Sequence, residues 1–174
     1  KQLINQRIWI SQSERAIGNL EKALSGLKDA ETGLRGYIIT KDTNTLLPYI
    51  NSFPVVDGSL RELKEAINID AFQEQKLVEL EALIHKKFAR MDSSKKILSA
   101  NNFTINDEFI RAFYQGKYYM DSIRVITMSM QQHEQNLILT KNKDLEAKQK
   151  ALKSIIISSL ILAIMLIIFG FATF

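Results

Sequence analysis

Apolar residues recur at seven-residue intervals through the first forty positions of the chain. One row contains Leu3, Ile10, Ile17, Leu24 and Ile38, with Glu31 in the same register, and a companion row contains Leu20, Leu27 and Leu34. A heptad pattern of this kind is typical of a helix that packs against other helices in a bundle or coiled coil. It predicts a first helix from about Leu3 to Thr40, about 60 Å long at about 1.5 Å per residue.

The next segment has a less regular pattern. We expect a polar turn over residues 41–45 and then a short helix around Tyr49. Proline lacks an amide hydrogen and clashes with the preceding helical turn, so Pro54 should interrupt a helix or start a new one. Ser59 and Glu62 have the spacing of a capping box, which predicts a separate helical stretch that begins there.

Heptad spacing returns in the second half of the chain. A third helix should begin around Asp70 and Gln73 and run to about Ala100, with four apolar residues in register: Leu77, Ile84, Met91 and Leu98. A short helix around Phe109 and a turn at Gly116 should follow. The last long helix should then begin near Lys117, with three apolar residues in register: Ile123, Met130 and Leu137.

The end of the chain is a long apolar segment. Residues 155–174 contain no charged side chain, and a helix of that length is about 30 Å long, which matches the hydrocarbon core of a bilayer. Core helices of soluble proteins are rarely apolar on every face, so we predict a transmembrane helix over residues 154–174. Residues 142–153 contain neither glycine nor proline, and the preceding helix is therefore expected to continue straight into the membrane.

These elements predict an all-α protein. The chain contains only 7 glycines and 2 prolines among 174 residues, and four long segments with short connections favour an up-down-up-down four-helix bundle. We assign residues 1–153 to this bundle, whose first and last helices are long, and residues 154–174 to the membrane. An even number of crossings places both ends of the bundle at one pole, so we expect a further membrane helix just before Lys1.

Composition and charge argue against several function classes. The chain has no cysteine, and its two histidines, His85 and His133, lack metal-binding spacing. The net charge is +4, and the lysines alternate with acids instead of forming a basic stripe with aromatic residues, which argues against nucleic acid as a partner. We expect no catalytic residue, metal or cofactor, and we do not expect this chain to be an enzyme. A membrane enzyme would need a bound metal or cofactor.

A polar cluster lies within the first helix. Glu31 occupies a heptad core position, where a carboxylate must be paired or neutralised. Arg35 lies four residues later, on the same face of the helix. Gly33 and Gly36 each cost about 1 kcal/mol in a helix interior. The simplest compensation for that cost is the close approach of a neighbouring helix.

Three motifs resemble a known family. The first reads DAETGLRGY and contains Asp29, Glu31, Thr32, Gly33, Arg35, Gly36 and Tyr37. The second is the pair Pro48 and Tyr49, and the third opens the last helix with Gly116, Lys117, Met120, Asp121, Ile123 and Arg124. Together they resemble the third class of CHASE domains, the cyclase- and histidine-kinase-associated sensory extracellular domains. The chain departs from the family pattern at Leu34, where glutamine is usual, and at Pro54 and Gly58, which disturb a helix that is usually continuous.

The resemblance implies a location and a role. It implies a bundle between two transmembrane helices, on the periplasmic or extracellular side of the cell membrane. It also implies that a histidine kinase, nucleotide cyclase or chemoreceptor module follows Phe174. The resemblance does not identify a ligand. Apolar seams near the membrane on the first and last helices favour a homodimer.

Two interpretations of the polar cluster remain open. In one, the interhelical network of Glu31, Arg35, Asp121 and Arg124 fixes the register of the helices, since buried ion pairs often give packing specificity with little net stability. In the other, the same network is the receptor site or a bistable switch.

The charge before the apolar segment supports an alternative function. Five lysines precede the span: Lys141, Lys143, Lys148, Lys150 and Lys153. Only two acids, Asp144 and Glu146, oppose them, and positive charge prefers the cytoplasmic side of a membrane. This feature alone favours a tail-anchored cytoplasmic scaffold or adaptor with a helical docking surface.

Overall fold

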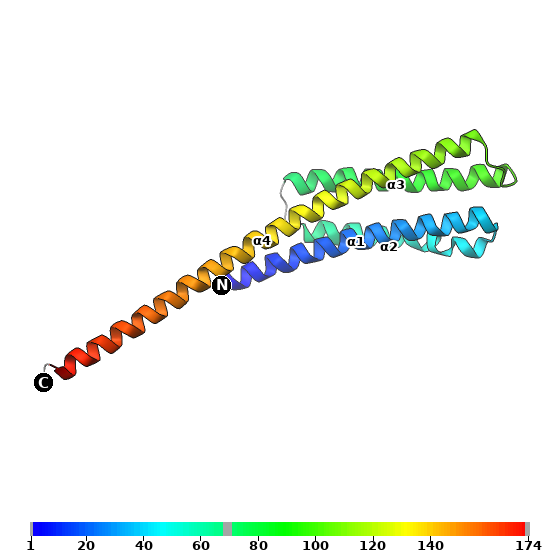
Figure 1. Ribbon diagram of the computed structural model, residues 1–174. Coiled ribbons are helices and arrows are strands. Elements are labelled where there is room, and N and C mark those ends of the chain that lie inside the picture. The colour runs from blue at the N-terminus through cyan, green and yellow to red at the C-terminus, as the bar shows by residue number, and fades with distance from the viewer. Residues whose placement is uncertain (1, 68–70, 173–174) are drawn as a thin grey trace.

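Two antiparallel helical hairpins form the body of the molecule (Figure 1). The structure is a computed structural model that describes residues 2–67 and 71–172, with side chains for 7–67 and 71–169. Its helices are α1 (Gln2–Thr40), α2 (Leu47–Ala66), α3 (Ala71–Ala100) and α4 (Asp107–Ala172), with a short 3-10 helix, η1 (Thr43–Leu46), before α2. The described ranges contain no strand, and the all-α four-helix fold predicted from the sequence is confirmed.

The heptad rows form the core of the bundle. On α1 the companion row is the deeper one, because Leu20, Leu27 and Leu34 are buried while Ile17 and Ile38 are only half-buried. The predicted row on α3 is entirely buried: Leu77, Ile84, Met91 and Leu98. Residues Ile123 and Met130 of α4 complete the core. Each such apolar side chain stabilises the fold by about 1.5–3 kcal/mol through its removal from water.

Glycines on α1 let the first hairpin close tightly. A Cβ atom added to Gly33 would lie 2.8 Å from the backbone nitrogen of Tyr49, and one added to Gly36 would lie 3.1 Å from the Cβ of Thr45. A Cβ at Gly26 would lie 2.7 Å from a methyl group of Val56. The close approach predicted for Gly33 and Gly36 is therefore confirmed, and it offsets the intrinsic cost of glycine in a helix.

Three predicted interruptions are wrong. Helix α2 runs unbroken through Pro54, because this proline is exposed and water can reach the carbonyl group that loses its donor. Ser59 starts no helix, since its hydroxyl donates to the carbonyl of Val55 one turn earlier (2.9 Å). Helix α4 likewise runs through Gly116 without a turn.

The boundaries of α3 and α4 differ slightly from the predictions. Asn106 caps α4 by accepting a hydrogen bond from the amide of Phe109 at 2.9 Å, so the short helix around Phe109 is the first part of α4. The predicted start of α3 at Asp70 lies outside the described residues. Gln73, the other residue of that prediction, is buried in the first turns of α3.

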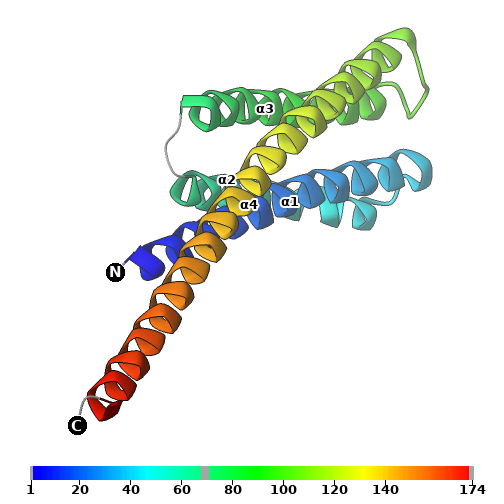
Figure 2. The same cartoon turned by 60° about the vertical axis from the view of Figure 1, so that its left-hand side comes forward.

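Helix α4 extends far beyond the bundle (Figures 1 and 2). Residues 146–169 are exposed on every face of the helix, and this part of α4 is long and apolar enough to cross a membrane. The start of α1 lies beside α4 near the same pole, where the ammonium of Lys141 is 5.6 Å from the ring centre of Trp9. The prediction that the last helix continues without a break into the apolar segment is confirmed.

Candidate functional site

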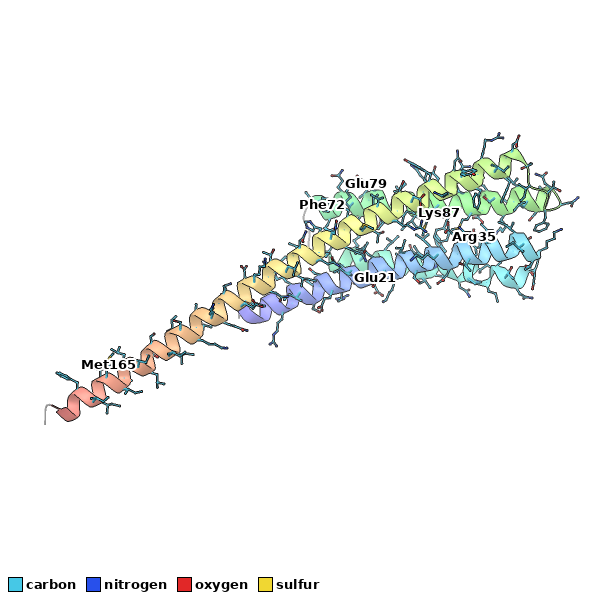
Figure 3. The ribbon with its side chains drawn as sticks, in the orientation of Figure 1. Glu21, Arg35, Phe72, Glu79, Lys87 and Met165 are labelled. Carbon is cyan, nitrogen blue, oxygen red and sulfur yellow. The ribbon has the colours of Figure 1, made fainter. Side chains whose placement is uncertain are left out.

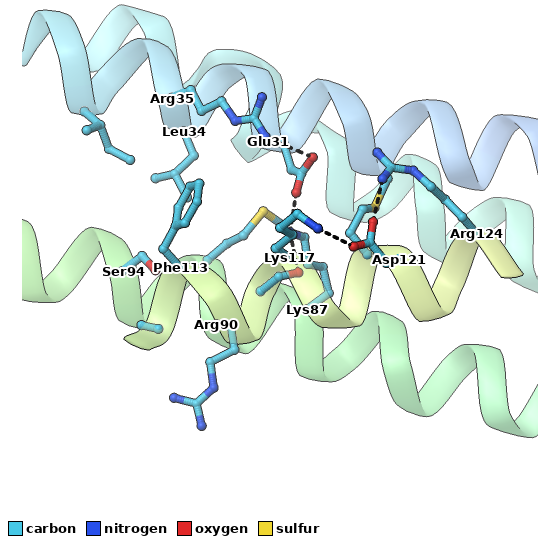
Figure 4. A pocket seen from close by; sticks show the side chains of 15 residues that line it. Glu31, Leu34, Arg35, Lys87, Arg90, Ser94, Phe113, Lys117, Asp121 and Arg124 are labelled. Atoms are coloured by element: carbon cyan, nitrogen blue, oxygen red, sulfur yellow. Dashed lines mark hydrogen bonds and ion pairs between the residues drawn. The ribbon is translucent and has the colours of Figure 1, made fainter. Parts of the chain in front are cut away.

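A cavity of about 260 Å³ lies between α1, α3 and α4, in the half of the bundle away from the apolar segment (Figures 3 and 4). Its apolar wall includes Leu34, Met91, Phe113 and Met120. The remainder of its lining is rich in charge, with five cationic side chains and two carboxylates: Arg35, Lys87, Arg90, Lys117, Arg124, Glu31 and Asp121. A mainly apolar pocket with a few converging polar groups is the usual form of a small-molecule site.

Lys87 of α3 lies at the centre of this charged lining. Its side chain is only 4% exposed. The ammonium donates to the carboxylate of Glu31 on α1 and to the carbonyl oxygen of Gly116 on α4 (2.9 Å), and thereby joins three helices. Arg35 adds a second cation to Glu31, with 3.8 Å between guanidinium and carboxylate. Arg35, Glu31 and Lys87 therefore form a triad of two cations on one acid.

The surroundings of Lys87 set its protonation behaviour. Burial lowers the pKa of the Lys87 ammonium below its usual value, because the charged form loses hydration. The hydrogen bond and charge of Glu31 oppose this shift, while the positive charges of Arg35 and Arg124 add to it. The amine is thus a buried cation that one carboxylate compensates only in part.

A second triad lies on α4 beside the first (Figure 4). Lys117 and Arg124 both donate to the carboxylate of Asp121, at 2.7 and 2.9 Å. The hydrogen bond from Lys117 is the main reason that the pKa of the Asp121 carboxyl is lowered. Within the residues that the structure describes, no ion pair joins this triad directly to Glu31 or Arg35, so the single network expected from the sequence is two neighbouring triads.

The structure brings together seven of the residues singled out in the sequence motifs. They line one cavity, and they are Glu31, Arg35, Gly116, Lys117, Met120, Asp121 and Arg124. The motifs at the start of α4 and near the end of α1, far apart in the chain, thus meet in space.

The other motif residues on α1 lie away from the cavity. Asp29 and Thr32 are exposed, and the Thr32 hydroxyl donates to the carbonyl of Lys28 in its own helix. Gly33 and Gly36 face α2 and η1. Tyr37 packs edge-on against Phe103 at the far end of the bundle, with 5.2 Å between ring centres.

The Pro48–Tyr49 pair has a packing role. Pro48 lies in the first turn of α2, against the position of Gly33. The buried ring of Tyr49 lies near Phe88 of α3, and its hydroxyl donates to Asp92 at 2.7 Å. Burial, followed by this hydrogen bond, raises the pKa of the Tyr49 hydroxyl above its usual value. The pair therefore anchors α2 to α1 and α3.

Sequence reasoning missed Lys87, although a signal for it exists. Gln73, Leu80, Lys87 and Ser94 form a second seven-residue row on α3, and all four are buried. Because three of the four are polar, the row looks like a solvated face. Along α3, the residues of this row alternate with those of the apolar row that begins at Leu77. The two rows together therefore have the spacing of the two core positions of a heptad.

The same row contributes a second polar pair in the half of the bundle nearer the apolar segment. The side-chain amide of Gln73 donates to the buried carboxylate of Glu134 at 2.7 Å. The neighbouring His133 is partly buried and stacks on Phe72 with 4.9 Å between ring centres. Polar groups are thus built into the core at two levels of the bundle.

The chemistry of the cavity favours binding over catalysis. The part of the chain that the structure describes holds no group of three or more histidine, cysteine or acidic side chains that could bind a metal ion. Both carboxylates in the lining are held by cations. Cations beside a carboxylate stabilise its charged form and so weaken it as a general base.

Comparisons with known proteins give one match. A family model described as the CHASE3 domain matches residues 6–144, a range that includes both triads and the cavity between them. No curated protein and no solved structure matches the chain. The matched range covers most of the chain and agrees with the resemblance carried by the three motifs. The chain belongs to the CHASE3 family, whose members are extracellular sensory domains of signalling receptors and are not catalytic.

Proposed function

We propose that this chain is the sensory input module of a membrane receptor whose cytoplasmic output domain is a histidine kinase, a nucleotide cyclase or a chemoreceptor module. A stimulus changes the packing of the four helices, and α4 passes the change through the membrane. The observation that carries the proposal is the continuity of α4, a single helix from Asp107 to Ala172. Its first part lines the cavity, and its last part is the apolar segment.

Contacts of α4 at the cavity provide the input to this relay. Gly116, Lys117, Asp121 and Arg124 all belong to α4, and the carbonyl of Gly116 is bonded to Lys87 of the neighbouring helix. A close-packed core transmits small displacements instead of absorbing them. Shifts of about 1–2 Å between packed helices are typical of such switches. A change at the cavity therefore displaces α4 as a rod.

The proposed location is the periplasmic or extracellular face of the cell membrane, in a protein with two spans. The start of α1 lies beside α4 (Figure 2), so a span that precedes Lys1 can enter the membrane next to the apolar segment. The output domain then follows Phe174. The lysines before the span favour the opposite orientation and a tail-anchored scaffold. The membership of an extracellular sensory family outweighs that single-sided charge count.

A homodimer forms part of the proposal. Apolar side chains are exposed where α1 and α4 leave the bundle, among them Ile8, Trp9, Leu139 and Leu152. The chain has no native cysteine, so a Leu152→Cys variant in membranes should form a disulfide-linked dimer on oxidation. Lys150→Cys, on nearly the opposite side of the helix, is the matched control. Equal cross-linking at both positions, or none at either, would contradict a defined dimer seam.

The relay is tested by insertions after Ala151 in the full receptor. Four glycines should uncouple output from the stimulus, because glycine favours a flexible chain over a helix. The control is a seven-residue helical insert, such as Ala-Glu-Ala-Ala-Lys-Ala-Ala. It adds about two turns, so the helix on either side of the insert keeps almost its original rotational orientation. We expect this control to retain signalling. Unchanged output with the glycine insert would overturn the relay.

A further inference from the structure

We infer that the cavity between α1, α3 and α4 binds a small organic carboxylate with an apolar tail. This inference rests on the proposed sensory function for its biological role, and it names the class of stimulus. It chooses the receptor interpretation of the polar cluster over the purely structural one.

The charge of the cavity favours an anionic ligand. Each triad joins two cations to one carboxylate, so each carries a net charge of +1. The two triads lie close enough that Arg124 of one affects the protonation of Lys87 in the other. Arg90 also belongs to the lining, although Figure 4 shows its guanidinium directed away from Glu31. A carboxylate between the triads would reduce this repulsion and gain charge-assisted hydrogen bonds.

Lys87 retains hydrogen-bonding capacity at the cavity. A lysine ammonium has three donors. Among the described residues, Glu31 and the carbonyl of Gly116 accept from Lys87, which leaves one N–H for a ligand. Because the side chain is 4% exposed and lines the cavity, an acceptor for that N–H must come from within the cavity. A bound carboxylate oxygen would supply it.

The apolar wall sets the form of the remainder of the ligand. Leu34 and Phe113 lie across from each other at the cavity (Figure 4). Beyond them an apolar groove shares three residues with the cavity, Arg35, Ile38 and Phe113, and continues along Ile105, Phe109 and Ile110. A carboxylate head held by Lys87 and Arg35 would direct its tail into this groove. A purely polar anion such as phosphate would leave the apolar wall uncovered.

Calorimetry on the full chain in lipid nanodiscs tests this inference. The probes are acetate, hexanoate and 1-hexanol, with titrations into empty nanodiscs subtracted. We expect hexanoate to bind and acetate to bind at least tenfold more weakly, because each methylene buried contributes about 0.8 kcal/mol, or roughly fourfold in affinity. Hexanol should bind at least tenfold more weakly than hexanoate, since it keeps the apolar tail but has no charge for the triads.

Charge-neutral variants locate the site. Arg35→Gln and Lys117→Gln should each weaken hexanoate binding about tenfold, as expected for the loss of one charge-assisted hydrogen bond. Both side chains are largely exposed, so the helices should remain folded, which circular dichroism checks. Arg61→Gln is the matched control, because Arg61 pairs with Asp57 on α2, outside the cavity lining. The control should bind hexanoate with unchanged affinity.

Three results would overturn the inference. They are an absence of hexanoate binding, equal binding of hexanol, and equal affinity of the cavity variants and the Arg61→Gln control. Calorimetry needs no output domain. Any of these results would therefore exclude the carboxylate ligand without bearing on the relay through α4, which the insertion experiment tests. Conversely, unchanged output with the glycine insert would overturn the relay and leave a measured carboxylate affinity intact.

Discussion

Lys87 of α3 and Glu31 of α1 form an ion pair that joins the two helical hairpins through the interior of the bundle. The two residues differ in the number of their charged partners and in their burial. Glu31 has a second cation in Arg35, and its side chain is 16% exposed. Lys87 is more deeply buried and has no second carboxylate among the described residues. This asymmetry determines which partner the fold tolerates losing.

The first prediction compares the two halves of this pair. Glu31→Gln leaves the Lys87 charge buried without a counter-ion and should lower the free energy of unfolding by about 3 kcal/mol. Lys87→Met should cost less, because the Glu31 carboxylate keeps Arg35 and partial access to water. Urea denaturation followed by circular dichroism measures both. An equal loss for the two variants, or a greater loss for Lys87→Met, would contradict the asymmetry.

The second prediction concerns helix contact at Gly33. Gly33→Ala places a methyl group 2.8 Å from the backbone nitrogen of Tyr49, so α1 and α2 must separate, at a cost of about 1–3 kcal/mol. Gly18→Ala is a matched control within the same helix, because a Cβ there has no neighbour within 4 Å. Removing a helical glycine should raise stability at that site by about 0.5–1 kcal/mol. Thermal unfolding of both variants should therefore show shifts of opposite sign, and shifts of the same sign would count against the close helix contact.

The third prediction is a pH dependence caused by Lys87. Burial lowers the pKa of this ammonium in the folded state, so over the interval from that lowered pKa to the usual value of about 10.4 the unfolded chain binds more protons. The contribution of Lys87 to the free energy of unfolding should therefore rise with pH across this interval. Urea titrations from neutral pH up to the usual lysine pKa of about 10.4 should show a steeper rise for the wild type than for Lys87→Met. Parallel pH profiles for the two proteins would contradict the assigned shift.

The helices and most of the core could be predicted from the sequence. The heptad rows that end at Leu98 on α3 and contain Ile123 on α4 identified buried faces, because a packed helix keeps its apolar residues at a fixed period. The predictions at Pro54 and Gly116 were wrong for a shared reason. Both residues disfavour a helix by themselves, and packing along the whole helix overrides that local preference.

The candidate site could be predicted only in part. Glu31, Arg35 and Asp121 were expected in a polar cluster, and they do line one cavity. The partner of Glu31 could not be identified from spacing, since Lys87 lies on another helix and sequence spacing reports only neighbours within one helix. A lysine is also rarely buried unless it is paired, so a row containing Lys87 is naturally interpreted as exposed.

A spin-label distance within α4 measures whether the bundle and the apolar segment are joined by one unbroken helix. Val125→Cys places one label on the bundle and Lys150→Cys places the other just before the apolar segment, both on exposed sites. Double electron–electron resonance on the full chain in nanodiscs, diluted with unlabelled chain, measures their separation. An unbroken helix over 25 residues predicts a narrow distribution near about 37 Å. A broad distribution, or one centred at a much shorter distance, would contradict a rigid connection between the bundle and the membrane.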